Sequence, residues 1–107
     1  MANTFKNKLV AGVSTEAEIY PCPSATTATV IGLTIANVGS GTASVTVKVV
    51  DNSETITCSV VKDAPVPVGG SLSILENQKI VLEAGDSIRV ASATSNSDVI
   101  VSVLQIT

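Results

Sequence analysis

The chain has 107 residues, which suits one domain with a substantial core and is too short for two. Its net charge is −3 and its six basic residues are scattered, so no basic stripe is present to bind nucleic acid. Histidine is absent, which excludes Ser-His-Asp and Cys-His catalytic sites and histidine-based metal centres. Hydrophobic residues make up 45% of the chain but aromatic residues only 2%, so the core must consist of small aliphatic side chains, which favours β-structure.

The N-terminal sequence does not have the form of a secretory leader, because Lys6, Asn7 and Lys8 interrupt its apolar residues. No apolar run approaches the roughly 20 residues that a membrane-spanning helix needs. We therefore expect synthesis in a cytoplasm and no membrane partner. In that reducing compartment Cys22 and Cys58 are expected to remain free thiols, and Cys58 lies in an alternating run that predicts a small buried side chain.

Apolar and polar residues alternate with a period of two, which predicts β-strands in the first half of the chain. The turn-forming sequence Asn37–Gly41 separates the third and fourth strands, so we expect these two to pair as a hairpin, and the fifth to extend them into a meander. The predicted strands are 8–13, 16–22, 27–38, 42–51 and 54–63. The residues expected to face inward are Ile31, Leu33, Ile35, Val45, Val47, Val49, Ile56, Cys58 and Val60.

The segment 64–70, rich in Pro and Gly, interrupts this pattern and predicts a crossover to a second sheet, because proline cannot donate to a central ladder. No segment carries a helical stripe longer than a turn. The fold class predicted is all-β, an antiparallel, jelly-roll-like β-sandwich of about eight strands. Residues 13–107 form its single domain, and residues 1–12 are an N-terminal arm or a first edge strand. The later strands are predicted at 71–76, 78–83, 86–93 and 97–106.

The segment Glu83-Ala84-Gly85-Asp86 offers two carboxylates beside a glycine. Its position between two predicted strands favours a hairpin turn with a positive φ at Gly85 and with Asp86 accepting from backbone N–H groups. On this interpretation Gly85→Val damages folding and Asp86→Asn costs little. A calcium site would need further oxygen ligands at alternating positions, so no metal and no cofactor is predicted.

Glu16 and Glu18 alternate with apolar residues and therefore point to the same face of a strand. Two solvated acids on the outer face explain this spacing. The alternative is an acid pair that performs catalysis, either these two residues or Glu83 with Asp86.

The last predicted strand is apolar on both faces, although a two-sheet sandwich buries one face of each sheet. Its outer face carries Ile100, Leu104 and Ile106. Either the N-terminal segment packs over this face, or another subunit does. The candidate interface residues are Phe5, Lys6, Lys8, Val81, Ile100, Leu104 and Ile106.

A characteristic pattern is seen in the stretches ANTFKNKLVAGV, APVPVGG and KIVLEAGDSIRV and in the ending VIVSVLQI. In this pattern the chain resembles small structural proteins of tailed bacteriophages, especially those of marine cyanobacteria. The resemblance covers nearly the whole chain and is carried by its turns and strands, with no catalytic signature. It implies a virion component that is a small β-sandwich and acts in multiple copies, on the capsid surface or in the neck, tail or baseplate.

The function predicted is therefore that of a non-enzymatic virion structural protein, a capsid decoration or cement protein that is made in the host cytoplasm and binds the virion lattice in multiple copies. Its expected partners are other virion proteins and further copies of itself. Weak contacts suffice for such a role, because multivalent attachment raises the effective concentration of each contact. A carbohydrate-binding, adhesin-like module is the alternative within the same architecture, but Phe5 and Tyr20 are the only aromatic residues available for a sugar platform.

Overall fold

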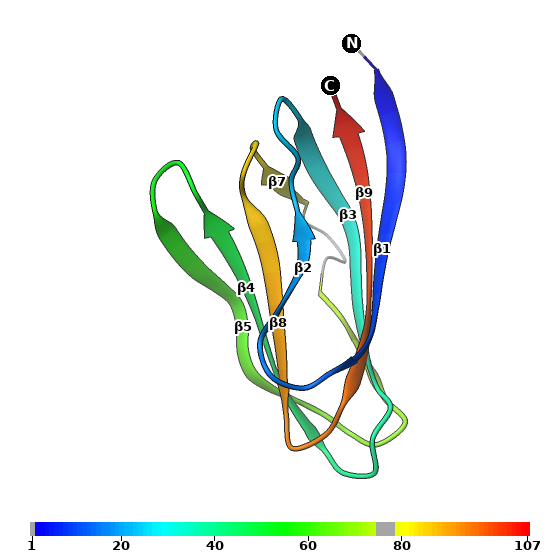
Figure 1. Ribbon diagram of the computed structural model, residues 1–107. Helices are drawn as coiled ribbons and strands as arrows, with labels where there is room; N and C mark the ends of the chain where they lie inside the picture. The colour runs from blue at the N-terminus through cyan, green and yellow to red at the C-terminus, as the bar shows by residue number, and fades with distance from the viewer. Residues whose placement is uncertain (1, 75–78) are drawn as a thin grey trace.

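A computed structural model describes residues 2–74 and 79–107. Within these ranges the chain forms nine strands in two antiparallel sheets that face each other, and it forms no helix that could cross a membrane (Figure 1). Sheet I contains β1 (Asn3–Val13), β9 (Ser97–Ile106), β3 (Thr27–Asn37), β6 (Ser71–Ser73) and β7 (Ile80–Leu82). Sheet II contains β2 (Ala17–Pro21), β8 (Ser87–Ala93), β4 (Ala43–Asp51) and β5 (Ile56–Val66).

The strand order is that of a jelly roll. The short strands β6 and β7 pair with opposite ends of β3 and act as one interrupted strand. Counted in this way, sheet I has the order β1-β9-β3-β6/β7 and sheet II the order β2-β8-β4-β5, and consecutive strands change sheet except at the β4–β5 hairpin. The prediction of an all-β, jelly-roll-like antiparallel sandwich of about eight strands is confirmed. Residues 75, 76 and 78 of the predicted strands lie outside the described residues.

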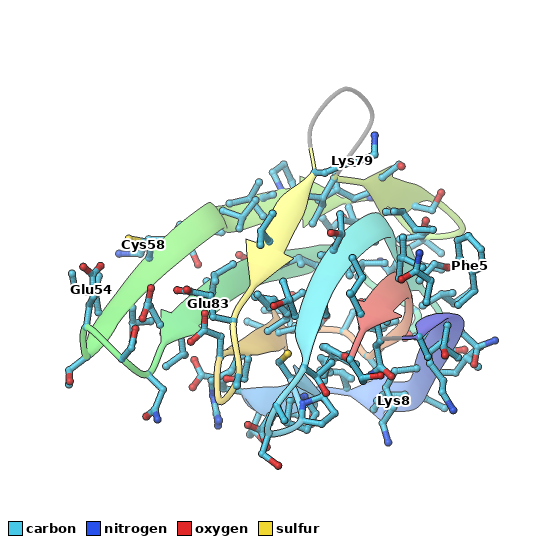
Figure 2. The ribbon with its side chains drawn as sticks, turned by 90° about the horizontal axis from the view of Figure 1, so that it is seen from above. Phe5, Lys8, Glu54, Cys58, Lys79 and Glu83 are labelled. Carbon is cyan, nitrogen blue, oxygen red and sulfur yellow. The ribbon has the colours of Figure 1, made fainter. Side chains whose placement is uncertain are left out.

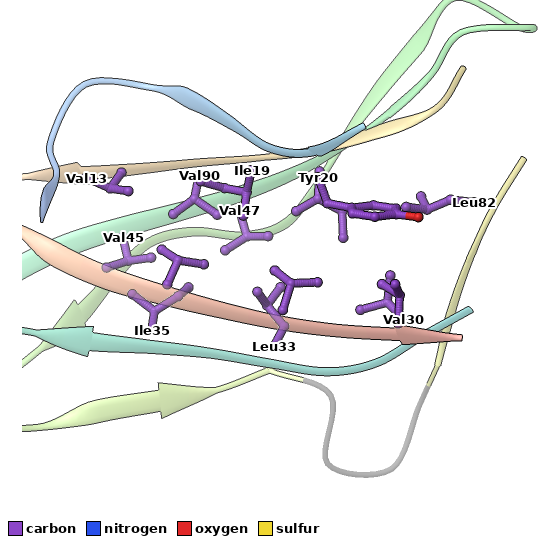
Figure 3. Packing of buried hydrophobic residues seen from close by; sticks show 14 of the residues in the cluster. Val13, Ile19, Tyr20, Val30, Leu33, Ile35, Val45, Val47, Leu82 and Val90 are labelled. Atoms are coloured by element: carbon purple, nitrogen blue, oxygen red, sulfur yellow. The ribbon is translucent and has the colours of Figure 1, made fainter. Parts of the chain in front are cut away.

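The core is a layer of aliphatic side chains between the sheets, as the composition predicts (Figure 3). Ile19, Leu33, Ile35 and Val47 are among the fully buried residues, each worth about 1.5–3 kcal/mol relative to an exposed position. Tyr20 also lies in the core, where its hydroxyl oxygen accepts a 2.6 Å hydrogen bond from the side-chain amide of Gln105 on β9.

The expected hairpin between the third and fourth strands is wrong, because β3 lies in sheet I and β4 in sheet II. The buried side chain of Asn37 explains the difference. Its amide donates to the carbonyl oxygens of Gly41 (2.7 Å) and Val66 (2.9 Å), and its backbone N–H donates to that of Gly70 (3.0 Å). These bonds fix the turn so that the chain crosses to the other sheet. The predicted crossover to the other sheet is confirmed, since β5 and β6 belong to different sheets, but it begins later than expected because residues 64–66 continue β5 and pair with β4.

A bulge in β3 reverses one of the inward-facing assignments. The register of β3 against β9 shifts between Val30 and Gly32, so that Val30 and Leu33 both point into the core. Ile31 is therefore not inward-facing, and 39% of its surface is exposed. A bulge inserts one extra residue and so changes the face on which the alternation continues.

The inward-facing assignment also fails on β5, where Ile56, Cys58 and Val60 are exposed. In this part of the molecule β5 is the edge of sheet II, and the facing edge of sheet I consists of the three-residue strands β6 and β7. Too little of sheet I extends over β5 to bury Ile56 and Cys58. At Val60 the register against β4 also shifts, so that Val61 packs against the core in its place. Leu33, Ile35, Val45 and Val47 are buried as predicted, and Val49 packs partly against the core.

The two ends of the described chain lie side by side on β1 and β9 (Figure 1). Backbone hydrogen bonds join Ala2 and Thr107 in both directions, at 3.2 and 3.0 Å. β1 is an edge strand that pairs with β9 alone, and its first seven residues are exposed. It therefore extends sheet I sideways and does not cover the outer face of β9.

Candidate interaction surface

The outer face of sheet I carries apolar residues that the register aligns in rows. Phe5 on β1 is opposite Leu104 on β9, which is opposite Thr29 on β3, which is opposite Val81 on β7. Opposed residues in an antiparallel sheet project from the same face, so these four form one row across the sheet. Its two ends are open to solvent, with 74% of Phe5 and 60% of Val81 exposed.

A second row runs parallel to the first, from Leu9 through Ile100 to Thr34. Leu9 and Ile100 are both exposed. Between the two rows lies a shallow hollow of about 320 Å³, whose lining includes Phe5 and Ile31. We call these two rows and the hollow between them the outer apolar face. The rows carry no charged side chain, and Lys6 is the one charged residue in the lining of the hollow. Contiguous exposed apolar surfaces of this kind mark interaction sites.

The sheet register separates the seven candidate interface residues into two groups. Phe5, Val81, Ile100, Leu104 and Ile106 occupy the outer face of sheet I, with Leu104 and Ile106 partly buried. Sequence reasoning missed Leu9, although its spacing from Phe5 places both on one face, and Ile31, which only the bulge turns outward.

Lys6 and Lys8 project from the opposite face of β1, since they are opposite the core-facing Val103 and Val101. Both lysines are nevertheless exposed, because β1 lies at the edge of its sheet. They flank the two apolar rows, and Lys6 also contributes to the lining of the hollow between them.

Glu16 and Glu18 are both exposed, as predicted for solvated acids. The carboxylate of Glu16 binds two cations of sheet II, Lys48 Nζ at 2.8 Å and Arg89 Nε at 2.9 Å. Hydrogen bonds from Lys48 and then Arg89 lower the pKa of Glu16 below its ordinary value of 4.5. Glu16 thus bridges cations of β4 and β8 at the surface, and its lowered pKa is the reverse of the raised pKa that a catalytic acid requires.

A polar hollow of about 510 Å³ lies on the outer face of sheet II. Its lining includes Glu16, Asp63 and Thr46 and contains no aromatic side chain. Tyr20 is buried, and burial raises the pKa of its hydroxyl. A sugar platform built on Tyr20 is therefore ruled out by its position.

The segment 83–86 is a turn, as predicted, but it connects β7 of sheet I to β8 of sheet II and so is not a hairpin. Gly85 has φ of +90°, which confirms its conformational role. Asp86 is 3% exposed, and its carboxylate accepts from the backbone N–H groups of Glu83 and Asn52, each at 3.0 Å. The predicted role of Asp86 as an acceptor is confirmed, but it fastens two loops, so the structure does not support the expectation that Asp86→Asn costs little.

Carboxylate oxygens of Asp51, Glu83 and Asp86 lie within 4.8 Å of one another. Both oxygens of Asp86 already accept backbone bonds, and one oxygen of Asp51 accepts from Ser53 and from the backbone of Glu54. These bonds lower the pKa of Asp51, with the backbone bond the larger cause. The cluster thus serves to order the two adjacent loops.

Cys22 and Cys58 are both free thiols in the structure, as predicted. Cys22 is buried, and its Sγ donates to the carbonyl oxygens of Thr26 (3.4 Å) and Leu82 (3.6 Å). Burial raises the pKa of this thiol. Cys58 is exposed on β5, so the expectation that it is a buried side chain is wrong for the reason given for that strand.

The amino-acid sequence matches no protein-family model, and no curated protein is similar to it. Among solved structures, the chain is similar to one in "Bacillus endospore appendages form a novel family of disulfide-linked pili", with a TM-score of 0.59 and 17% identity over 99% of this chain and 87% of that one. It is also similar to a chain in the acid-stable capsid of Helicobacter pylori bacteriophage KHP30, with a TM-score of 0.54 and 12% identity over 100% of this chain and 89% of that one.

A third similar structure is the nucleoplasmin-like N-terminal domain of Drosophila FKBP39, with a TM-score of 0.52 and 14% identity over 98% of this chain and 91% of that one. At these identities the likeness concerns the fold. The all-β sandwich of this chain is thus shared with a pilus structure, a phage capsid structure and a nucleoplasmin-like domain.

Proposed function

We propose that the chain is a non-enzymatic structural protein of a tailed-phage virion, and that it decorates the capsid in multiple copies by docking its outer apolar face onto neighbouring virion proteins. The observation that carries the proposal is the pair of rows on the outer face of sheet I, which carry no charged side chain. The first row ends in the exposed side chains of Phe5 and Val81. The sequence resemblance to phage structural proteins and the similarity in fold to a chain of the KHP30 capsid support it.

The energetics of this face suit attachment in many copies. Complete burial of a large aliphatic or aromatic side chain is worth about 1.5–3 kcal/mol. The four exposed apolar residues of the two rows therefore supply several kcal/mol before the entropy of association is subtracted. They are Phe5, Leu9, Val81 and Ile100. That is a weak contact for one copy. Attachment to a repeating lattice makes it sufficient, because each bound neighbour raises the effective concentration of the next contact.

A component of the neck, tail or baseplate would use the same face, so the location in the particle distinguishes these roles. The test is an electron-microscopic reconstruction of the intact particle, in which we expect density for this chain on the capsid shell. Density at the neck or tail would replace decoration by the alternative, and absence of the chain from purified particles would refute the virion role.

The docking face is tested by binding to particles assembled without the chain. We expect the double variant Phe5→Ser/Val81→Ser to cosediment with such particles at least about tenfold more weakly than the unaltered chain, since two apolar contacts are lost. The control is Val38→Ser/Val68→Ser, which removes two exposed valines from turns outside sheet I. Equal binding of the two double variants would show that the outer apolar face is not the docking surface.

A further inference from the structure

Two edge strands of equal length lie on opposite sides of the sandwich. β1 is an edge of sheet I and β5 an edge of sheet II, and each has eleven residues (Figure 1). Both expose apolar side chains, Phe5 and Leu9 on β1, and Ile56 and Val60 on β5. Each edge also leaves backbone N–H and C=O groups without a neighbouring strand among the described residues, which is what strand addition requires.

The charges at these two edges have opposite signs. β1 carries Lys6 and Lys8 and no acidic residue. The other side carries Asp51 and Glu54 at the β4–β5 turn and Glu83 beside β7, and Figure 2 shows Glu54 and Glu83 on the opposite side of the molecule from Phe5 and Lys8.

None of these five side chains takes part in an ion pair within the part of the chain that the structure describes. Two cations lie near these acids along the chain, Lys62 of β5, which Asp63 follows directly, and Lys79, which directly precedes β7. With them this side still carries four acids, Asp51, Glu54, Asp63 and Glu83, against two cations. The charges at both edges are thus available to a partner.

We propose that copies of this chain associate head to tail, with the β1 edge of one copy against the β5 edge of the next. Each edge offers exposed apolar residues with charged residues around them, which is the anatomy of a protein interface, and the two sets of charges are complementary. Because the two surfaces differ and lie on opposite sides, the contact is heterologous and repeats from copy to copy, producing a ring or a filament.

This inference rests on the proposed multi-copy structural role. It concerns the edges of the two sheets, although Phe5 and Leu9 of the β1 edge also belong to the outer apolar face. It also differs from a second explanation of Lys6 and Lys8, namely that charged residues on an edge strand prevent association. Under that explanation Glu at the same two positions protects the edge equally well. Under head-to-tail association, Glu faces the acidic side of the next copy and weakens the contact.

Charge reversal on the isolated chain tests the proposal. Sedimentation velocity at about 50 mM salt, where the Debye length exceeds 10 Å, measures self-association of the unaltered chain. We expect Lys6→Glu/Lys8→Glu and Glu54→Lys/Glu83→Lys each to associate at least about tenfold more weakly, because like charges are opposed. An equimolar mixture of the two variants should recover association, since every contact between unlike copies is again complementary. Ser40→Lys is the control, which changes the charge at an exposed residue of the turn between β3 and β4, outside both edge strands.

Association of both reversed variants at the level of the unaltered chain would overturn the proposal, and so would failure of their mixture to recover association. A monomeric unaltered chain at all concentrations would overturn it too, while leaving particle binding by the outer apolar face unaffected. The orientation is tested with a bismaleimide, which should join Asn7→Cys of a Cys58→Ser chain to Cys58 of an unaltered chain. Crosslinking within Asn7→Cys/Cys58→Ser alone would indicate a symmetric β1–β1 contact instead.

Discussion

The substitution Asp86→Asn tests whether the buried carboxylate fastens the turn at 83–86 to the loop after β4. In the native protein each oxygen of Asp86 accepts one backbone N–H, at 3.0 Å from Glu83 and 3.0 Å from Asn52. An asparagine retains one acceptor oxygen and places an NH₂ group where the other oxygen was. One of the two backbone donors then loses its acceptor and faces another donor.

The expected loss of stability follows from these two contacts. A hydrogen bond to a charged group contributes about 1.5–3 kcal/mol, so Asp86→Asn should lower the free energy of unfolding by about 2 kcal/mol. Asp86→Ala leaves both donors without their acceptor and should cost more, about 3 kcal/mol. For a domain of this size a loss of 2 kcal/mol corresponds to a fall in Tm of about 10 °C.

Urea denaturation of the three chains provides the measurement, with the m-value checked for constancy so that the midpoint reports stability. The matched control is Glu83→Gln, which neutralises the neighbouring exposed carboxylate and should change the free energy of unfolding by less than about 0.5 kcal/mol. If Asp86→Asn were as stable as this control, the carboxylate would not be fastening the two loops and the reasoning would be refuted.

Three further predictions concern single side chains. Gly85→Val should lower the free energy of unfolding by about 2 kcal/mol, because a β-branched residue is strained at φ of +90°. Gly41→Val is the control, since Gly41 lies in open space without a positive φ, and equal urea midpoints of the two variants would contradict the prediction. Cys58 should react with a thiol reagent in the native protein and Cys22 only in urea, so titration should give one thiol and then two; two in the native state would contradict the burial of Cys22. Glu16 has a lowered pKa in the folded chain, so its ion pairs stabilise the fold above pH 4.5, and this contribution is lost as the pH falls through the lowered pKa. The urea midpoints of the native chain and of Glu16→Gln should therefore differ at pH 7 and converge in acid. A difference that does not change with pH would argue against this role of Glu16.

The positions of the strands could be predicted from the sequence, but some of their pairings could not. Alternation is a local property, so each strand can be recognised within its own three to eleven residues. The destination of a turn is not local. Asn37 directs its turn across to sheet II through a bond to Val66, 29 residues away, and nothing in the sequence Asn37–Gly41 distinguishes that turn from a hairpin.

Burial was predicted less well where the sandwich is uneven. The apolar residues of β5 alternate as those of a covered strand do, but the facing edge of sheet I is too short to bury Ile56. On β9 the alternation does give the correct inner face, Val99, Val101 and Val103, because both neighbours of this strand are long. The same alternation of β9 places Ile100 on the outer side of sheet I, so part of the outer apolar face could be predicted from the sequence. The role of this face as an interface stays a prediction.

The pairing of the two chain ends has a consequence for how the fold can be rewired. Because Ala2 and Thr107 are already bonded to each other, a short flexible linker between them would turn β9 and β1 into an ordinary hairpin without moving either strand. A turn would then join β9 to β1, and new chain ends could be opened in an exposed turn on the other side of the sandwich. In such a circularly permuted chain β1 would lie in the middle of the sequence while it remained the edge strand of sheet I, with Phe5 and Leu9 still exposed.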